Sequence, residues 1–177
     1  MNSQSDSLGK LLRYTAWANE VLYQMMCTVD GDILVRPRQG RPSGALGVLG
    51  HIYVVGLIWK GHLTGQAHGF ANRNLEPLPP VADLRKRQAA LDAWYCSFAT
   101  SLTPEQRHVP IEFRFVDGGP GTMTAEEMVL HVVNHGTYHR GYVADMLYEA
   151  GLKPPTMDLP VFIRDVVTAS GRKRTSA

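Results

Sequence analysis

The chain has 177 residues and a formal net charge of +2 at pH 7, with 44% hydrophobic and 19% charged residues. This balance is typical of one soluble globular domain with a real core, and it argues against a disordered chain. The small net charge gives no basis for nucleic-acid binding, which needs basic residues clustered on one face. We expect residues 1–170 to form a single domain and residues 171–177, which include Arg172-Lys173-Arg174, to be a flexible basic tail.

The sequence also carries information about the compartment. Its N-terminus is polar and has no apolar signal segment, and its longest apolar stretch, residues 52–59, is too short to span a bilayer. Cys27 and Cys96 lack the CxxC spacing, and we expect both to be buried or half-buried free thiols. The sequence therefore predicts a cytoplasmic protein without a membrane partner.

Two amphipathic helices are predicted in the first half of the chain. Over residues 7–29, apolar side chains recur at alternating intervals of three and four, which forms one stripe along a helix. A second helix is predicted over residues 43–64, with Ser43 as its N-cap. Its glycines each weaken a helix by about 1 kcal/mol relative to alanine, so they suggest close helix contacts. Residues 65–80, rich in Gly, Asn and Pro, are predicted to be a surface loop.

A small hairpin is predicted between the third and fourth helices. The third helix is expected over residues 82–101, with a turn or a short helical start at residues 103–106. Residues 109–116 alternate between apolar and charged side chains, as in a half-exposed strand, and a glycine-rich turn follows at residues 117–121.

The fourth helix is predicted over residues 125–150, because Thr124 and Glu127 have the spacing of a capping box and Gly151 suits a helix end. A last short helix is expected over residues 159–167. Four amphipathic helices of about 20 residues each predict an all-α four-helix bundle, antiparallel or with a long crossover, which carries a small β-hairpin before the fourth long helix.

Three histidines recur every four residues in the fourth helix, at His131, His135 and His139. Residues four apart lie on the same helix face, so two such imidazoles can bind one metal ion. Spacing leaves two pairs open, His131 with His135 and His135 with His139, because the outer two lie about 12 Å apart along the axis. Zinc proteases with this spacing have a glutamate after the first ligand. Here that position is Gly136, so their mechanism is not supported.

Two helical histidines make an incomplete site, and a third ligand must come from elsewhere in the chain. His51 lies among apolar residues of the second helix, so we expect its ring to face inward. His62 lies near the end of the same helix, where a solvent-exposed residue or a cap is expected. His68 lies in the glycine-rich loop and His108 precedes the strand. For His62, His68 and His108, a packed or solvated histidine is the favoured interpretation.

Sequence motifs spread over nearly the whole chain resemble those of the DinB-like family of damage-inducible proteins. The motifs are Tyr14-Thr-Ala-Trp17-Ala-Asn19, Leu49-Gly-His51-Ile with Trp59, His131-Val-Val-Asn134-His135-Gly-Thr-Tyr138-His139-Arg140-Gly141, and Glu149-Ala-Gly-Leu-Lys-Pro-Pro155 with Asp158. The resemblance implies a four-helix bundle with a long crossover, often a homodimer, and one divalent metal ion held by His51, His135 and His139. It places His131 outside the ligand set and leaves zinc, nickel, iron and manganese as candidate metals.

The same resemblance implies an enzyme. Three protein ligands leave coordination positions open, as in catalytic sites. Some relatives are implied to be transferases or isomerases in which a low-molecular-weight thiol binds the metal. The hypothesis is therefore a thiol-dependent transferase or a hydrolase that acts on a small molecule. The alternatives are a non-catalytic metal or small-molecule binding protein of the stress response, and a purely structural bundle with packed histidines.

Further candidates flank the implied ligands. Asn134 and Tyr138, like His131, are candidates for hydrogen bonds that orient a ligand or contact a substrate. Arg140 can clamp a substrate carboxylate, but an ion pair with Asp158 or Asp145 is the favoured interpretation.

Overall fold

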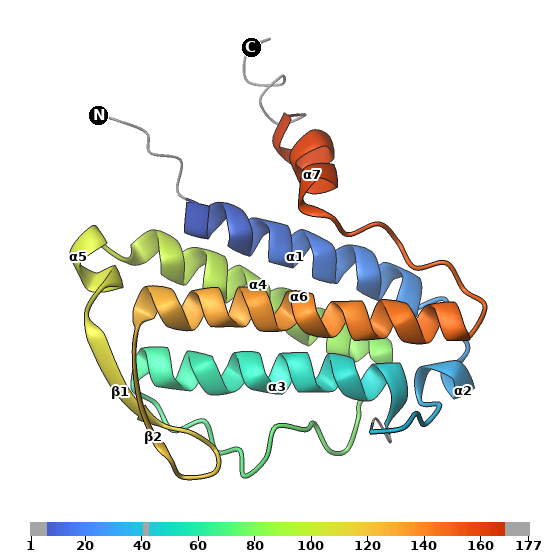
Figure 1. The fold of residues 1–177 in the computed structure, drawn as a ribbon, viewed down its shortest axis with the longest axis horizontal. Coiled ribbons are helices and arrows are strands. Elements are labelled where there is room, and N and C mark those ends of the chain that lie inside the picture. Colours follow the sequence, from blue (N-terminus) through green and yellow to red (C-terminus); the bar gives the residue numbers. More distant parts are fainter. Residues whose placement is uncertain (1–6, 41–42, 169–177) are drawn as a thin grey trace.

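The computed structural model describes residues 7–40 and 43–168, and its body is a four-helix bundle (Figure 1). The long helices are α1 (Ser7–Met26), α3 (Gly44–Thr64), α4 (Val81–Ser101) and α6 (Ala125–Glu149). This confirms the fold class expected from the helical periodicity. The predicted basic tail at residues 171–177 lies outside the described residues.

The bundle has a crossover topology. In Figure 1, α1 and α6 run in one direction, while α3 and α4 run in the opposite direction. As a result α1 packs chiefly against the antiparallel α4, and α3 packs chiefly against the antiparallel α6. Since α3 and α4 are parallel, residues 65–80 must return along the length of the bundle, beside α3 (Figure 1).

The shorter elements lie at the ends of the bundle. One-turn helices α2 (Gly31–Leu34) and α5 (Pro104–Arg107) follow α1 and α4 respectively. The hairpin pairs β1 (Pro110–Arg114) with β2 (Pro120–Thr124), with Phe113 opposite Gly121. A Cβ at position 121 would lie 2.5 Å from the Phe113 ring, so any larger residue there would force that ring to move. After α6 the chain runs back alongside α1 (Figure 1) to α7 (Leu159–Phe162), which continues as a π-helical turn, η1 (Ile163–Val167).

The predicted strand, residues 109–116, is longer than the observed β1. Pairing stops at Arg114 because the Phe115 amide donates to the carbonyl of Gly119 and the Phe115 carbonyl accepts from Gly118 in the turn. The first helix likewise ends at Met26 and not at residue 29, since the Thr28 amide turns back to the carbonyl of Met25.

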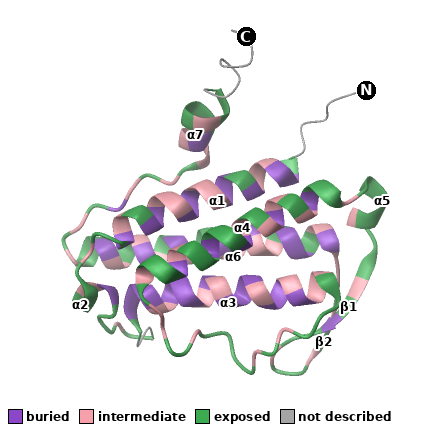
Figure 2. Cartoon of the chain, turned by 180° about the vertical axis from the view of Figure 1, so that it is seen from behind, coloured by how far each residue is buried: buried purple, intermediate pink, exposed green. Residues whose placement is uncertain are grey.

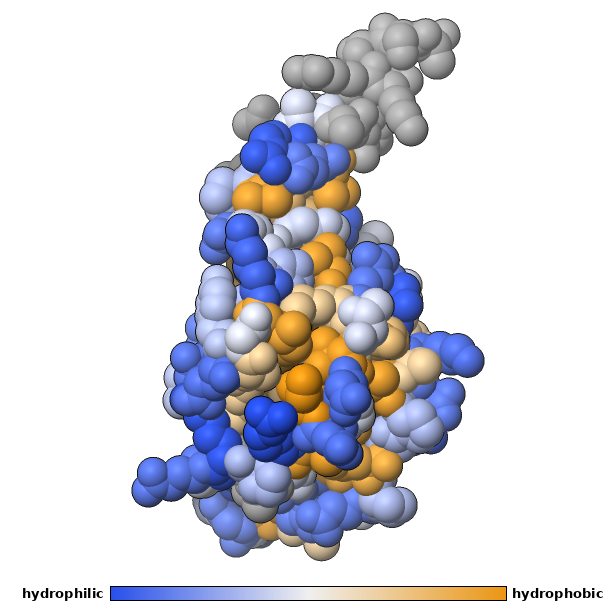
Figure 3. All heavy atoms as spheres, turned by 90° about the vertical axis from the view of Figure 1, so that its right-hand side faces the viewer, coloured by the Kyte–Doolittle hydropathy of each residue, from blue (hydrophilic) through white to orange (hydrophobic). Residues whose placement is uncertain are grey.

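The hydrophobic core fills the space between the four long helices, whose inner faces are buried and outer faces exposed (Figure 2). At the end of the bundle beside α2, hydrophobic side chains reach the surface inside a hydrophilic rim (Figure 3). Helix α3 is long and apolar enough to cross a membrane by composition, but 72% of its apolar window is buried. It is therefore the core helix of the bundle, as in a soluble protein.

Three local predictions have different outcomes in the packed structure. Close contact is confirmed at Gly56, where an added Cβ would lie 2.8 Å from Leu91 Cδ2 of α4. Ser43 stands at the N-cap of α3, but its side chain makes no capping hydrogen bond. Cys27 is exposed, contrary to expectation, while Cys96 is partly buried, and both are free thiols.

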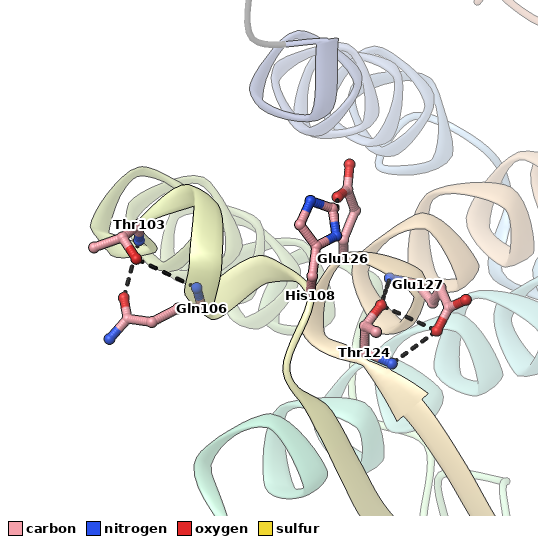
Figure 4. Close-up of polar contacts among 6 residues, drawn as sticks. All are labelled: Thr103, Gln106, His108, Thr124, Glu126 and Glu127. Carbon is pink, nitrogen blue, oxygen red and sulfur yellow. Dashed lines mark hydrogen bonds and ion pairs between the residues drawn. The ribbon is translucent and has the colours of Figure 1, made fainter.

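Helix α6 begins with the predicted capping box (Figure 4). The Thr124 hydroxyl accepts a hydrogen bond from the Glu127 amide at 3.2 Å, and the Glu127 carboxylate accepts one from the Thr124 amide at 2.7 Å. The same motif starts α5, between Thr103 and Gln106 (Figure 4). The cap fixes where α6 begins, and so fixes which of its residues face α3.

Candidate metal centre

The packing of α3 against α6 brings three histidines from different parts of the chain to one place. His51 Nε2 of α3 lies 3.1 Å from His135 Nε2 of α6. The ring centroid of His139 lies 4.6 Å from that of His51 and 4.3 Å from that of His135. One ligand atom from each of the three residues lies within 4.8 Å of the others. We call these three residues the histidine cluster.

A main-chain group orients His51. Its Nδ1 lies 2.9 Å from the carbonyl oxygen of Arg73, in the crossover loop 65–80. A carbonyl can only accept, so Nδ1 carries the proton and donates it. The neutral ring then has its lone pair on Nε2, the atom that faces His135, so the ring is presented in the tautomer that a metal ligand requires.

The protonation state of His135 also suits a ligand. Burial lowers the pKa of His135 to about 3, with further contributions from the charges of His139, His51 and His131. The imidazole is therefore neutral at physiological pH and available for coordination.

The dimensions of the cluster fit a single divalent ion. Metal–nitrogen bonds of about 2.0–2.1 Å separate neighbouring ligand nitrogens by about 2.9–3.4 Å in octahedral or tetrahedral sites. The 3.1 Å separation of the His51 and His135 nitrogens falls in this range. Three imidazoles suit zinc, nickel and iron alike, so the ligand set does not choose among these three candidate metals.

Two cavities meet at the cluster, and His51 and His139 line both. The larger, of ≈ 400 Å³, has an apolar wall that includes Ile58, Trp59 and Phe115, and Arg73 also lines it. The other, of ≈ 320 Å³, lies beside the start of α3 and is lined by polar groups, among them Asn74 and Glu76. An ion in the cluster would be reachable by small molecules from both.

His131 lies beside the cluster but is directed elsewhere. Its ring centroid is 4.8 Å from that of Trp59 and 5.6 Å from that of His135, and it lines the larger cavity. Burial lowers its pKa. His62 lines the same cavity against Trp59 and Phe113, and is partly buried, not exposed as its place near the helix end suggested.

The two other flanking candidates face outward. Asn134 is exposed on α6. Tyr138 is 59% exposed; its ring lies edge-on to His139 at 5.0 Å, and its hydroxyl is 2.5 Å from that of Tyr142. Tyr138 therefore contacts a cluster residue through its ring.

Arg140 has a different position from the one expected. It is only 2% exposed, lines neither cavity at the cluster, and donates hydrogen bonds of 3.0 Å to Asn19 Oδ1 and Thr137 Oγ1. The expected ion pair with Asp145 is wrong, since Asp145 pairs with Arg38 at 2.7 Å. The guanidinium lies inside the bundle because Gly136 leaves room for it: a Cβ there would lie 3.1 Å from Arg140 Nη1.

A polar network behind the cluster was not predicted. Asn19 and Gln88 each donate a hydrogen bond of 2.9 Å to the carboxylate of Asp92, and Asn19 also accepts from Arg140. Burial raises the pKa of Asp92, against the effect of these hydrogen bonds and of the Arg140 charge. The spacing of four between Gln88 and Asp92 in the predicted third helix was a signal of a shared helix face. The contact of Arg73 with His51 had no such signal, because it uses a backbone carbonyl.

Sequence comparison now places the chain among known proteins. The profile described as the DinB family matches residues 1–169, which is almost all of the chain. The chain belongs to the DinB family. This confirms the resemblance suggested by the motifs in α1, α3 and α6.

Individual DinB relatives agree with this assignment. The chain is 27% identical over 165 residues to Protein DinB of Bacillus subtilis (strain 168), a match that covers 90% of this chain and 95% of the relative. The crystal structure of a DinB-like protein from Bacillus cereus has the same fold, with a TM-score of 0.64 at 15% identity, and the match covers 88% of this chain and 99% of the other. Membership of the DinB family and the histidine cluster are both compatible with metal binding.

Proposed function

We propose that this DinB-family protein binds one divalent metal ion through His51, His135 and His139, and that it is a metal-dependent enzyme of the thiol-dependent transferase or hydrolase type. The observation that carries the proposal is the convergence of the three rings, with the His51 and His135 nitrogens 3.1 Å apart. The candidate metals are zinc, nickel, iron and manganese. The proposal includes a cytoplasmic location and the homodimer that the family resemblance implies.

The two cavities support an enzyme more than a simple metal carrier. A storage or structural site is usually closed around its ion, whereas a catalytic site leaves coordination positions accessible. Here a small molecule can approach the cluster from either cavity. When bound, a divalent ion in such a site polarises substrate oxygen atoms and lowers the pKa of a coordinated water or thiol.

The protein's own groups would position the reactants. Trp59 and Phe115 offer flat apolar surfaces to the body of a substrate in the larger cavity, and they exclude water from it. The second cavity, with Asn74 and Glu76, offers hydrogen-bonding groups to a polar cosubstrate such as a low-molecular-weight thiol.

Elemental analysis tests the metal site. We expect about one divalent ion per chain in the wild-type protein and loss of that ion in His135→Ala, because the His135 ring centroid lies 5.0 Å from that of His51 and 4.3 Å from that of His139. His131→Ala, on the same face of α6, and His108→Ala, at an exposed position, are matched controls that should keep the ion. Unchanged metal content in His135→Ala would show that the assignment is wrong.

Activity is tested separately on metal-loaded protein. We expect turnover of an electrophilic or ester substrate in the presence of a thiol cosubstrate or water, and loss of turnover in His135→Ala. Stoichiometric metal without turnover with any thiol would favour the non-catalytic binding protein.

A further inference from the structure

A small cavity of ≈ 20 Å³ lies beside the histidine cluster, and His135 lines both this cavity and the larger accessible one. His135 forms one wall of the small cavity. The opposite side includes Thr15 and Asn19 of α1 with Gln88 and Asp92 of α4. The cavity thus separates His135 from the polar network that contains Asp92 and Arg140.

The size and the lining of this cavity fit one water molecule. A polar cavity holds a water when it offers at least about 10–15 Å³ to the centre of a water-sized probe and two to four polar partners. Two polar atoms of its lining residues, Thr15 Oγ1 and Gln88 Oε1, are buried without a hydrogen-bond partner within the described part of the chain. A buried polar group without a partner costs about 1–3 kcal/mol, so a water that pairs with both is favoured.

The hydrogen-bond polarity leads from His135 to Asp92. His135 Nε2 faces His51 Nε2 at 3.1 Å, and His135 also lines the cavity. When Nε2 is a ligand, Nδ1 carries the proton and is the donor available to a water there. A water can accept a hydrogen bond from the Nδ1–H group and donate one to Gln88 Oε1. Gln88 in turn donates its Nε2–H to Asp92 at 2.9 Å. Every donor in this series of hydrogen bonds therefore points toward the Asp92 carboxylate.

We propose that Thr15, Gln88 and Asp92 hold a buried water against His135 Nδ1, and that this water positions the ring and increases its strength as a metal ligand. The inference rests on the proposed metal site. The three are positioning residues, because they act on the ion through the water and His135. Arg140 supports the arrangement by donating to Asn19, which holds the second oxygen of Asp92.

In this proposal His51 and His135 are both oriented by a hydrogen bond from Nδ1, but to different acceptors. His51 Nδ1 donates to the carbonyl of Arg73, while His135 Nδ1 would donate to the bound water. Groups that orient a metal-bound histidine in this way commonly change metal affinity by about 10- to 100-fold when they are removed.

Thr15→Val is the sharpest test, because it keeps the shape of the side chain and deletes only the unpaired hydroxyl. If Thr15 merely packs, its removal should leave metal affinity unchanged and be neutral or favourable for stability. We expect instead a Zn²⁺ affinity about tenfold weaker than wild type, measured by competition with a chromophoric chelator. Asp92→Asn should also weaken the Zn²⁺ affinity.

Tyr23→Phe is the matched control, since Tyr23 also carries a buried hydroxyl without a hydrogen-bond partner in the described residues but does not line this cavity. It should bind Zn²⁺ as the wild type does. Wild-type affinity in Thr15→Val, or an equal loss in Tyr23→Phe, would overturn the proposal.

A high-resolution crystal structure of the wild-type protein gives a readout that does not depend on any variant folding. We expect density for a water within hydrogen-bond distance of Thr15 Oγ1, Gln88 Oε1 and His135 Nδ1. A cavity without such density contradicts the inference. A water present in a protein that binds no metal would refute the proposed function and the role of the water in metal binding, and would leave a structural water only.

Discussion

At the scale of single residues, burial and hydrogen bonding decide what each polar side chain can do. Arg140 directly follows a histidine of the cluster, yet its charge is used inside the bundle, where it bonds Asn19 and Thr137 and lies 5.7 Å from the Tyr14 ring centroid. Asp92 contributes the compensating negative charge to the same network. Burial of this guanidinium is compensated by the hydrogen bonds that Nη1 and Nη2 donate.

Replacement of Arg140 by methionine should therefore be costly. The change keeps much of the side-chain length but leaves Asn19 Oδ1 without its donor and Asp92 without a nearby positive charge. We expect a loss of about 3 kcal/mol in the free energy of unfolding, measured by urea denaturation.

Arg38→Met is the control for that experiment. Arg38 pairs with Asp145 and Glu149 at the surface, where both carboxylates are more than half exposed. An exposed pair contributes about 0–1 kcal/mol, so the expected loss is small. Equal losses for the two variants would contradict the account of Arg140.

At the scale of the helices, local signals set where elements begin and ionic contacts join them. The capping box of Thr124 and Glu127 starts α6, and an equivalent box starts the one-turn α5. Between α1 and α4, the Glu20 carboxylate accepts a hydrogen bond of 3.1 Å from Arg85 Nε. These contacts lie at the surface, so their effects on stability should be modest and separable.

Thr124→Ala should lower the free energy of unfolding by about 1 kcal/mol, because the amide of Glu127 loses its acceptor at the start of a 25-residue helix. Thr103→Ala removes the same bond from α5, which has four residues and buries none of them. Thermal and urea unfolding should show a clearly smaller loss of stability in Thr103→Ala than in Thr124→Ala. A larger effect at Thr103 than at Thr124 would contradict the importance of the cap for the bundle.

The contact between Glu20 and Arg85 predicts a pH dependence. The Arg85 side chain lowers the pKa of Glu20 below its ordinary value of 4.5. The folded state therefore binds this proton more weakly than the unfolded state. The contribution is fully present above pH 4.5 and is lost as the pH falls through the lowered pKa.

Glu20→Gln should thus reduce stability slightly near neutral pH and converge with the wild type in acid. Because Glu20 is partly exposed, solvent screening keeps the difference small. Urea denaturation at pH 7 and at pH 3 measures it. A difference that grows in acid would have the wrong sign.

At the scale of the whole molecule, the histidine cluster links two helices that are far apart in sequence. His51 belongs to α3, while His135 and His139 belong to α6, and these helices form one of the two closest pairs of the bundle. The three histidines form a common binding site for an ion only in the folded chain. Metal binding and the global stability of the fold are therefore coupled.

Addition of Zn²⁺ or Ni²⁺ should raise the melting temperature of metal-free protein. A ligand at 100 times its Kd stabilises the folded state by about 2.7 kcal/mol. For a chain of this size that corresponds to a shift of about 5 to 11 °C. Calorimetry should show the shift in the wild type and in His108→Ala. A shift of equal size in His135→Ala would mean that the ion binds elsewhere.

The extent of agreement between sequence and structure follows the range of the interactions involved. Helix and hairpin positions follow from apolar periodicity and capping residues, which act within one or two turns. They therefore agree with the structure except at a few ends and at the one-turn α2, which was not predicted. The end of β1 differs because hydrogen bonds in the turn interrupt the ladder. Arg140 differs more, because its partner Asn19 lies 121 residues earlier in the chain.

The sequence by itself determined four amphipathic helices, a capped start for α6, and histidines spaced for one helix face, since backbone hydrogen bonding and side-chain periodicity are local properties. Spacing left the ligand pair open, and only family resemblance pointed to His51, His135 and His139. The tertiary structure brought these three together, placed the Arg73 carbonyl behind His51, and enclosed Arg140 beside Asn19. Those contacts depend on how far α3 slides along α6 and where the crossover loop returns, and packing of the whole core decides both.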